Sequence, residues 1–198
     1  MDTLVLASTN PGKIADFRSL LTPLKIQLIS QQELSIPDVP ETGSTFIENA
    51  LIKARHAATH TNYPTLADDS GLIIDDLKGA PGLYSARFAG HKATPEQNIE
   101  KVLQELKLNP ASARRARLYA VVVLLRSPTD PTPVIGEGFW EGTILHKPTG
   151  HGFGYLPIFF STLHQRPATT LSIEERNQTN HRGQAMRQLL DKLLKSHD

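Results

Sequence analysis

The sequence predicts an α/β fold built around a mixed sheet, and three observations support this prediction. Extended apolar runs and amphipathic helical patterns alternate along all 198 residues. Hydrophobic side chains make up 39% of the chain, which is enough for one substantial core. No linker, low-complexity tract or internal repeat interrupts the order. We therefore expect residues 1–198 to form a single domain, with room for two closely joined lobes but not for two independent domains.

Short apolar runs bounded by turn residues predict the strands. The runs expected to form strands are residues 3–7, 26–29, 65–67, 72–77 and 118–125. Residues 134–145 are expected to form a hairpin-like pair of extended segments, because glycines interrupt them. Residues 68–71 are polar and are expected to separate two of the strands.

Apolar side chains at helical spacing predict four helices, and most of them follow residues that favour a helix start. The periodic stretches are residues 14–21, 46–58, 95–106 and 185–194. The turn at residues 8–12 precedes the first helix, Ser44 or Thr45 is placed to cap the second, and Thr94 is placed to cap the third. The glycine-rich residues 150–154 are expected to form a loop.

Charge and cysteine content exclude several classes of function. The 21 basic and 20 acidic side chains leave a net charge of +1, so no overall field draws the protein to nucleic acid or anionic lipid. The absence of cysteine excludes disulfides, thiolate metal sites and thiol catalysis. The N-terminal run lacks the basic start and cleavage site of an export signal. We expect a cytoplasmic protein that binds neither nucleic acid nor a membrane.

A polar turn between the first strand and the first helix has the composition of a phosphate-binding segment. Backbone N–H groups at a helix N-terminus can face an anion, and Lys13 adds a positive charge. The segment is not a Walker loop, because Ile14 follows the lysine where a hydroxyl is required. The candidate binding residues are Ser8, Thr9, Asn10, Pro11, Gly12 and Lys13. Taken alone, such a turn is more often solvated surface.

The adjacent carboxylates Asp68 and Asp69 lie between two apolar runs, near the mouth of the core. Two crowded carboxylates repel each other unless a cation or a shared proton relieves them. Hard oxygen ligands suit Mg²⁺, which takes one or two protein carboxylates and completes its shell with water and phosphate. Glu41, in a loop before a helix, is a candidate third carboxylate. The alternative is an ordinary turn in which an aspartate bonds the backbone.

Two further segments have the composition of a base-binding site. Residues 150–155 combine glycines with Phe153 and Tyr155, which suits the approach and stacking of a planar ring. His181 and Arg182, just ahead of the last helix, add polar groups that can read a base or clamp a phosphate. The alternatives are aromatic side chains that belong to the core and a His-Arg pair on the surface.

Together these segments resemble the deaminated-purine nucleoside triphosphate pyrophosphatases, the RdgB-like proteins and inosine triphosphatases. The matching stretches are residues 4–13, 41–58, 67–90, 152–160 and 181–185. The resemblance implies an ITPase-like elongated mixed sheet with flanking helices, and two lobes with a central active-site cleft. It also implies a homodimer that hydrolyses ITP, dITP and XTP to the monophosphate and pyrophosphate, which cleanses the nucleotide pool.

The resemblance also implies roles for individual residues. Asp69 corresponds to the proton acceptor and, with Glu41, to the Mg²⁺ ligands, while Lys13 and Asp68 correspond to supporting catalytic residues. The positions that correspond to substrate-binding residues are Ser8, Thr9, Asn10, Pro11, Gly12, Lys13, Ser70, Phe153, Gly154, Tyr155, Leu156, Arg176, His181 and Arg182.

Three positions depart from the family pattern. Leu156 stands in place of an aspartate, Arg176 in place of a lysine, and Asn180 in place of a serine. The first two changes look coupled, because an unpartnered ammonium beside a buried base is costly. We therefore expect intact hydrolytic groups and an altered or loosened choice of purine. A Maf-like pyrophosphatase of other modified nucleotides and a non-catalytic nucleotide-binding protein remain as alternatives.

Overall fold

The computed structural model describes residues 2–109 and 111–195, which form the expected α/β fold. Its strands make one mixed seven-stranded sheet in the order β2-β1-β3-β4-β5-β6-β7. The pairs β1–β2 and β1–β3 are parallel, whereas β5–β6 and β6–β7 are antiparallel. The strands are β1 (Thr3–Leu6), β2 (Gln27–Ser30), β3 (Thr65–Ile74), β4 (Arg115–Leu125), β5 (Val134–Ile144), β6 (Phe159–Ser161) and β7 (Arg166–Pro167). The helices are α1 (Pro11–Leu21), α2 (Phe46–Ala58), α3 (Pro95–Lys107), α4 (Ile173–Thr179) and α5 (His181–Lys195).

The chain divides into two compact units. Unit 1 takes the residues up to Asp69, Ala120–Gly138 and the residues from Asn177 onward, and unit 2 takes Ser70–Tyr119 and Phe139–Arg176. The strands β3, β4 and β5 each contribute residues to both units. The expectation of one domain with two lobes stays a prediction.

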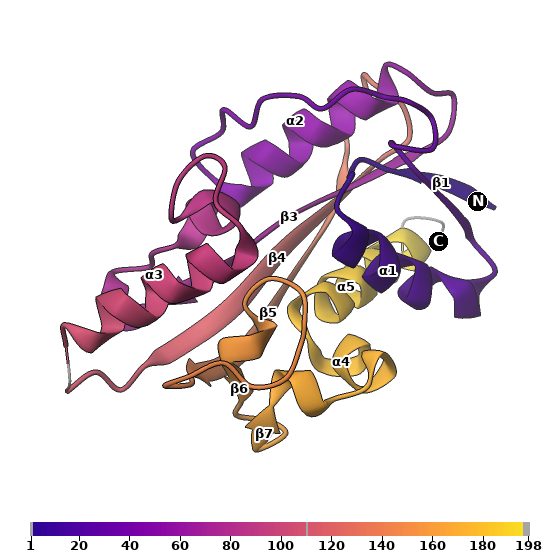
Figure 1. Ribbon diagram of the computed structural model, residues 1–198. Coiled ribbons are helices and arrows are strands. Elements are labelled where there is room, and N and C mark those ends of the chain that lie inside the picture. The colour runs from indigo at the N-terminus through magenta and orange to yellow at the C-terminus, as the bar shows by residue number, and fades with distance from the viewer. Residues whose placement is uncertain (1, 110, 196–198) are drawn as a thin grey trace. The chain divides into compact units, whose positions relative to one another are not determined.

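Unit 1 is built on strands that are covered on both faces. The side chains of Phe17 and Leu21 from α1 and of Met186 from α5 form one core cluster with even-numbered strand residues such as Leu6 and Val122. The helix α2 presents a face of buried alanines. It covers the opposite side of these strands, as Figure 1 shows. A charged side chain on the central strands of unit 1 therefore lies between the sheet and one of these helices.

The glycines of β5 accommodate α5 and do not interrupt the strand. We expected a hairpin-like pair over residues 134–145, and this is wrong, because β5 is continuous. A Cβ atom on Gly136 would lie 2.0 Å from the carbonyl oxygen of Ala185, and one on Gly138 would lie 2.1 Å from that of His181. The missing side chains allow the backbone of α5 to approach the strand.

The polar residues 68–71 also lie inside a strand. We expected them to separate two strands or to form a turn, but β3 runs unbroken from Thr65 to Ile74. The strand lies between β1 and β4 in the sheet, so its backbone is paired there. Its polar side chains find partners on neighbouring helices, which removes the need for a solvated turn.

Unit 2 has its own core, which α3 covers on one side. Ile99, Val102 and Leu106 of α3 pack in one cluster with Trp140 and Phe159. The sequence predicted α3, including its cap at Thr94. It did not predict α4, β6 or β7, because segments of seven, three and two residues are too short to show a period.

Candidate active site

The predicted phosphate-binding segment lies at the N-terminus of α1. Asn10 caps this helix, since its Oδ1 accepts a hydrogen bond from the backbone N–H of Lys13 at 3.1 Å. Ser8 Oγ accepts from the backbone N–H of Asn10 at 3.2 Å, and Pro11 is the first helical residue. The remaining N–H groups and the positive end of the helix dipole suit an anion.

Lys13 and Asp68 form a buried ion pair behind this segment. Lys13 Nζ contacts Asp68 Oδ1 and also donates to the backbone carbonyl of Asp68 at 3.3 Å. Arg182 Nε lies 3.5 Å from Asp68 Oδ2, and the Asp68 side chain is fully buried. Burial would raise the pKa of Asp68, but Lys13, Arg182 and Lys53 hold it well below its usual value. Asp68 is therefore an ionised anchor for cationic side chains and does not have the character of a base.

Arg182 joins α1 to β3 from the first turn of α5. We expected His181 and Arg182 ahead of this helix, but the helix already begins at His181. Arg182 Nη1 contacts Asp16 Oδ2 at 2.9 Å, and its side chain is only 8% exposed. Asp16 was not among the predicted site residues, although it lies three residues after Lys13 on α1 and so projects from the same side of that helix.

Asp69 lies in a separate group of side chains that includes α2. Lys53 Nζ lies 2.7 Å from Asp69 Oδ1 and 2.8 Å from Glu41 Oε1. Asn49 Nδ2 donates to Asp69 Oδ2 at 3.4 Å. Successive residues of a strand point to opposite faces, so Asp68 turns toward α1 and α5 while Asp69 turns toward α2. The two carboxylates are thus not the crowded pair that we expected.

Lys53 is the central site residue that sequence reasoning missed. The available signal was the polar face of α2, where Asn49 and Lys53 recur at a spacing of four residues opposite the alanines. Burial would lower the pKa of Lys53, but Asp69, Glu41 and Asp68 together raise it. Lys53 is therefore a stable cation between two carboxylates.

The pKa of Asp69 moves in the opposite direction from that of Asp68. Burial raises it, and Glu41 adds a repulsion, against the opposing charges of Lys53 and Lys13. A carboxylate with a raised pKa holds a proton more readily, which is what a proton acceptor in a reaction requires. The adjacent aspartates are therefore suited to different tasks.

The loop that follows Glu41 is tied to the first turns of α2. Asn49 Oδ1 accepts a hydrogen bond from the N–H of Gly43 at 2.8 Å, and a Cβ on Gly43 would lie 2.6 Å from the Cβ of Glu48. Thr45, one of the two predicted caps, forms a capping box with Glu48. The loop therefore presents Glu41 in a defined place.

The pair Glu41 and Asp69 fits a hard divalent cation that takes few protein ligands. Their carboxylate oxygens converge on one cationic nitrogen, and Mg²⁺ commonly uses one or two carboxylates together with water and phosphate. Among residues 2–109 and 111–195, no group of three or more His, Cys, Asp or Glu side chains could hold a metal ion. Two carboxylates suit a cation of the kind that fills its remaining positions with water and phosphate.

The predicted base-binding residues do not share one unit. Phe153 is 43% exposed in unit 2, whereas Tyr155 is buried in the core there and its hydroxyl donates to the Ser85 carbonyl at 2.8 Å. Leu156 packs against the same core. The other predicted residues in unit 2 are Ser70 on β3, Gly154 with a φ of 59°, and Arg176 on α4.

His181 belongs to unit 1, together with Arg182. Its side chain is buried, and Nδ1 has no hydrogen-bond partner within the part of the chain that the structure describes. Burial, followed by the charge of Arg182, lowers the pKa of His181 well below its usual value. The imidazole is therefore neutral, with a polar atom left for another group.

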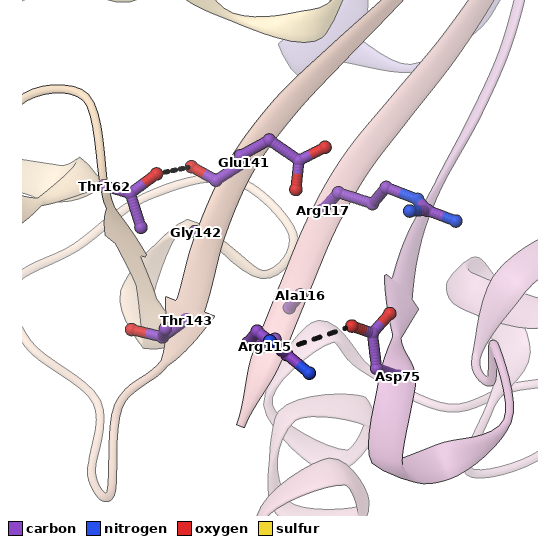
Figure 2. A pocket seen from close by; sticks show the side chains of 8 residues that line it. All are labelled: Asp75, Arg115, Ala116, Arg117, Glu141, Gly142, Thr143 and Thr162. Carbon is purple, nitrogen blue, oxygen red and sulfur yellow. Dashed lines mark hydrogen bonds and ion pairs between the residues drawn. The ribbon is translucent and has the colours of Figure 1, made fainter. Parts of the chain in front are cut away.

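A hollow of about 270 Å³ in unit 2 has none of the predicted site residues in its lining. Figure 2 shows the arginines of β4 and residues of β5 around it, with Arg115 directed toward Asp75. The residues that line it are Asp75, Arg115, Ala116, Arg117, Glu141, Gly142, Thr143 and Thr162. It is a feature of the sheet surface and not a candidate for the hydrolytic site.

Comparison with known proteins adds to this geometry. The model of the Ham1 family matches residues 4–192. A dITP/XTP pyrophosphatase of Xanthomonas campestris pv. campestris (strain 8004) is 52% identical over 194 residues, 98% of each chain. A solved HAM1 protein from Coxiella burnetii superimposes with a TM-score of 0.87 at 49% identity and covers 98% of this chain and 100% of that chain. A nucleoside-triphosphatase/dITP/XTP pyrophosphatase from Mycobacterium abscessus gives a TM-score of 0.72 at 38% identity over 95% and 98%.

Proposed function

Because this chain belongs to the Ham1 family, we propose that it hydrolyses dITP, ITP and XTP to the nucleoside monophosphate and pyrophosphate. The observation that carries the proposal is that unit 1 contains two clusters of paired charges. In the first, Lys13 pairs with Asp68 behind the N-terminus of α1; in the second, Lys53 pairs with Glu41 and Asp69. The first group suits phosphate and the second suits a cation and a proton acceptor. Relatives named for this activity support the choice of substrate.

The reaction assigned to these residues is the attack of water on the α-phosphorus. The bond between this phosphorus and the oxygen that bridges to the β-phosphorus breaks, and pyrophosphate leaves. Asp69 accepts the proton of the water, and Lys13 with the N-terminus of α1 holds phosphate oxygens. Mg²⁺ would be held by Glu41 and Asp69, where it would supply charge neutralisation for the triphosphate.

A substrate panel tests the activity. Purified protein with Mg²⁺ is assayed for pyrophosphate release from the triphosphates of inosine, deoxyinosine, xanthosine, guanosine and adenosine. The proposal expects hydrolysis of the first three, with loss of activity when a chelator is added. Failure to release pyrophosphate from any of them would contradict the proposal. A modified pyrimidine triphosphate assayed alongside them then separates the alternatives, because the Maf-like one expects its hydrolysis and the non-catalytic one expects none.

The choice among purines is proposed to be looser than the family pattern implies. Leu156 packs against the apolar core of unit 2, where a carboxylate would need a partner. Without that carboxylate, this segment has one fewer group that discriminates between bases by hydrogen bonding. A hundredfold preference for inosine and xanthosine triphosphates over guanosine triphosphate would contradict this part of the proposal.

Two copies of the chain are proposed to associate through the exposed face of β4 and β5 in unit 2. Tyr119 and Phe139 stack there with ring centroids 4.6 Å apart, and Phe139 is 44% exposed. Arg117 lies over the Phe139 ring, and Glu141 is exposed on the same strand (Figure 2). A two-fold dimer places the same patch on both copies, and a patch with aromatic rings and charges of both signs is complementary to itself.

Light scattering at micromolar concentration tests this association. The wild type is expected to be a dimer, and Phe139→Asp is expected to be a monomer. Leu163→Asp, at another exposed apolar position of unit 2, is the control and is expected to stay dimeric. A monomeric wild type, or a dimeric Phe139→Asp variant, would contradict the proposed face.

The cytoplasm is the proposed compartment, because nucleoside triphosphates are made and consumed there. No helix within residues 2–109 and 111–195 is long and apolar enough to cross a membrane. Fractionation of cells that express a tagged chain tests the compartment. The expectation that the protein binds neither nucleic acid nor a membrane stays a prediction.

A further inference from the structure

The ammonium of Lys53 contacts both carboxylates that we propose as metal ligands. Its Nζ atom lies 2.8 Å from Glu41 Oε1 and 2.7 Å from Asp69 Oδ1. The Lys53 side chain is 14% exposed, so water screens these contacts only weakly. The Lys53 ammonium thus already neutralises part of the negative charge of Glu41 and Asp69 that would attract a metal ion.

A divalent cation and the Lys53 ammonium compete for the same two oxygens. With Lys53 present, the two carboxylates carry a net charge of about −1, and the ammonium itself repels an incoming cation. Asn49 cannot replace this charge, because its amide is neutral while it donates to the other oxygen of Asp69. Metal binding through Glu41 Oε1 and Asp69 Oδ1 therefore requires the ammonium to move.

A triphosphate offers the ammonium another partner. A lysine ammonium is a compact charge with three donors on a flexible four-carbon stem, so it can exchange a carboxylate for a phosphate oxygen. Once the ammonium has moved, both carboxylates are available to the metal. Nucleotide binding and metal binding then assist each other, and by linkage each raises the affinity of the other by the same factor.

We propose that Lys53 couples metal binding to nucleotide binding: its ammonium keeps divalent metal from Glu41 and Asp69 until a triphosphate draws it away. This inference rests on the proposed function, because it requires a triphosphate substrate. The competing explanation is a purely structural lysine that ties α2 to the Glu41 loop and to β3. The two explanations differ in the affinity for metal when nucleotide is absent.

The test measures Mn²⁺ binding by calorimetry, with and without the α,β-methylene analogue of dITP. Three proteins are compared: the wild type, Lys53→Met, which keeps the length without the charge, and Lys53→Arg, which keeps the charge. Lys53→Met is expected to bind Mn²⁺ alone about tenfold more tightly than the wild type, since such couplings are typically 5- to 150-fold. The gain in Mn²⁺ affinity caused by the analogue should fall by the same factor. Lys53→Arg should behave like the wild type.

Unchanged or weaker binding of Mn²⁺ alone by Lys53→Met would overturn the proposal and favour the structural role. Circular dichroism checks that the variant is folded, and Lys53→Gln provides the same comparison if the methionine variant does not fold. Binding of metal alone involves no turnover, so this result is independent of the substrate panel. A wild type that hydrolyses no triphosphate would count against the proposed function and leave the Mn²⁺ comparison interpretable.

Discussion

The strand β4 passes through both units, and its two halves differ. In unit 2, residues 115–119 alternate between exposed or half-buried and buried positions, whereas residues 120–125 in unit 1 are all buried. The sequence follows this change, from Arg-Ala-Arg-Leu-Tyr to Ala-Val-Val-Val-Leu-Leu. A strand covered on one face needs apolar side chains at every second position, and one covered on both faces needs them at every position. The sequence of a strand therefore indicates whether one or both of its faces are covered.

One ion pair from each unit shows the same difference in burial. In unit 1, Arg182 and Asp16 are paired with side chains 8% and 15% exposed. In unit 2, Arg166 and Glu175 are paired with side chains 42% and 45% exposed. Exposed pairs contribute little, whereas buried pairs carry a large desolvation cost and are weak candidates for stability alone. The buried charges of unit 1 are therefore best explained by chemistry.

Removing the carboxylate of Asp69 is expected to have the largest effect. Asp69→Asn should reduce pyrophosphate release by about a thousandfold, because it removes the proton acceptor while keeping the shape of the side chain. Asp75→Asn, at an exposed carboxylate of unit 2, is the control and should stay close to wild type. Both are measured with dITP and Mg²⁺. Substantial activity in Asp69→Asn would contradict the assignment of Asp69 in unit 1 as the proton acceptor.

The two ion pairs can be compared directly by stability. Arg182→Gln removes a buried cation that pairs with Asp16 and Asp68, although Asp68 keeps Lys13, and should lower the free energy of unfolding by about 3 to 5 kcal/mol. Arg166→Gln removes an exposed pair and should cost about 1 kcal/mol or less. Urea denaturation of both variants measures the difference. Equal losses of stability in the two variants would contradict the expectation that the buried pair is more costly to break than the exposed one.

His181 should make the stability depend on pH. In the folded state, burial lowers the pKa of His181, and the charges of Arg182 and Lys13 lower it further. The negative charge of Asp68 raises this pKa but does not outweigh the other effects. Below pH 6.5 the unfolded chain therefore binds more protons than the folded one, so stability is full above this pH and declines as pH falls. Below pH 6.5, stability is expected to decline by up to about 1.4 kcal/mol for each pH unit.

Substitution isolates this contribution. His181→Gln should flatten the decline between pH 7 and pH 5 in urea denaturation, whatever its effect at neutral pH. His151→Gln, at an exposed position of unit 2, should leave the decline unchanged. An unaltered slope in His181→Gln would assign the pH dependence to other groups.

Tyr155 should show the smallest effect. Tyr155→Phe removes the hydrogen bond to the Ser85 carbonyl and should cost about 1 kcal/mol of stability in unit 2. Because its ring lies in the core, kcat/KM for dITP should change by less than about twofold. A large rise in KM with unchanged stability would instead indicate contact between Tyr155 and the base.

Most of the fold could be predicted from the sequence, since long periodic segments carry their own signal. The four predicted helices correspond to α1, α2, α3 and α5, and three of the strand runs correspond to β1, β2 and β4, because apolar spacing and capping residues act locally. The errors fell where local chemistry and tertiary packing disagree. Gly136 and Gly138 resemble breakers in isolation but admit α5, and the polar residues 68–71 resemble a turn but lie within a paired strand.

The sequence by itself determined the composition of the candidate site. Lys13, Glu41, Asp68 and Asp69 were singled out because their types and neighbours suit phosphate and metal. Only the tertiary structure decided their partners: it turned Asp68 and Asp69 to opposite faces of β3, brought Lys53 to Glu41 and Asp69, and brought Arg182 to Asp68. Residue type is local information, whereas the partner of a buried charge depends on which distant segments the sheet brings beside it. The burial of that charge, and hence its pKa, has the same dependence.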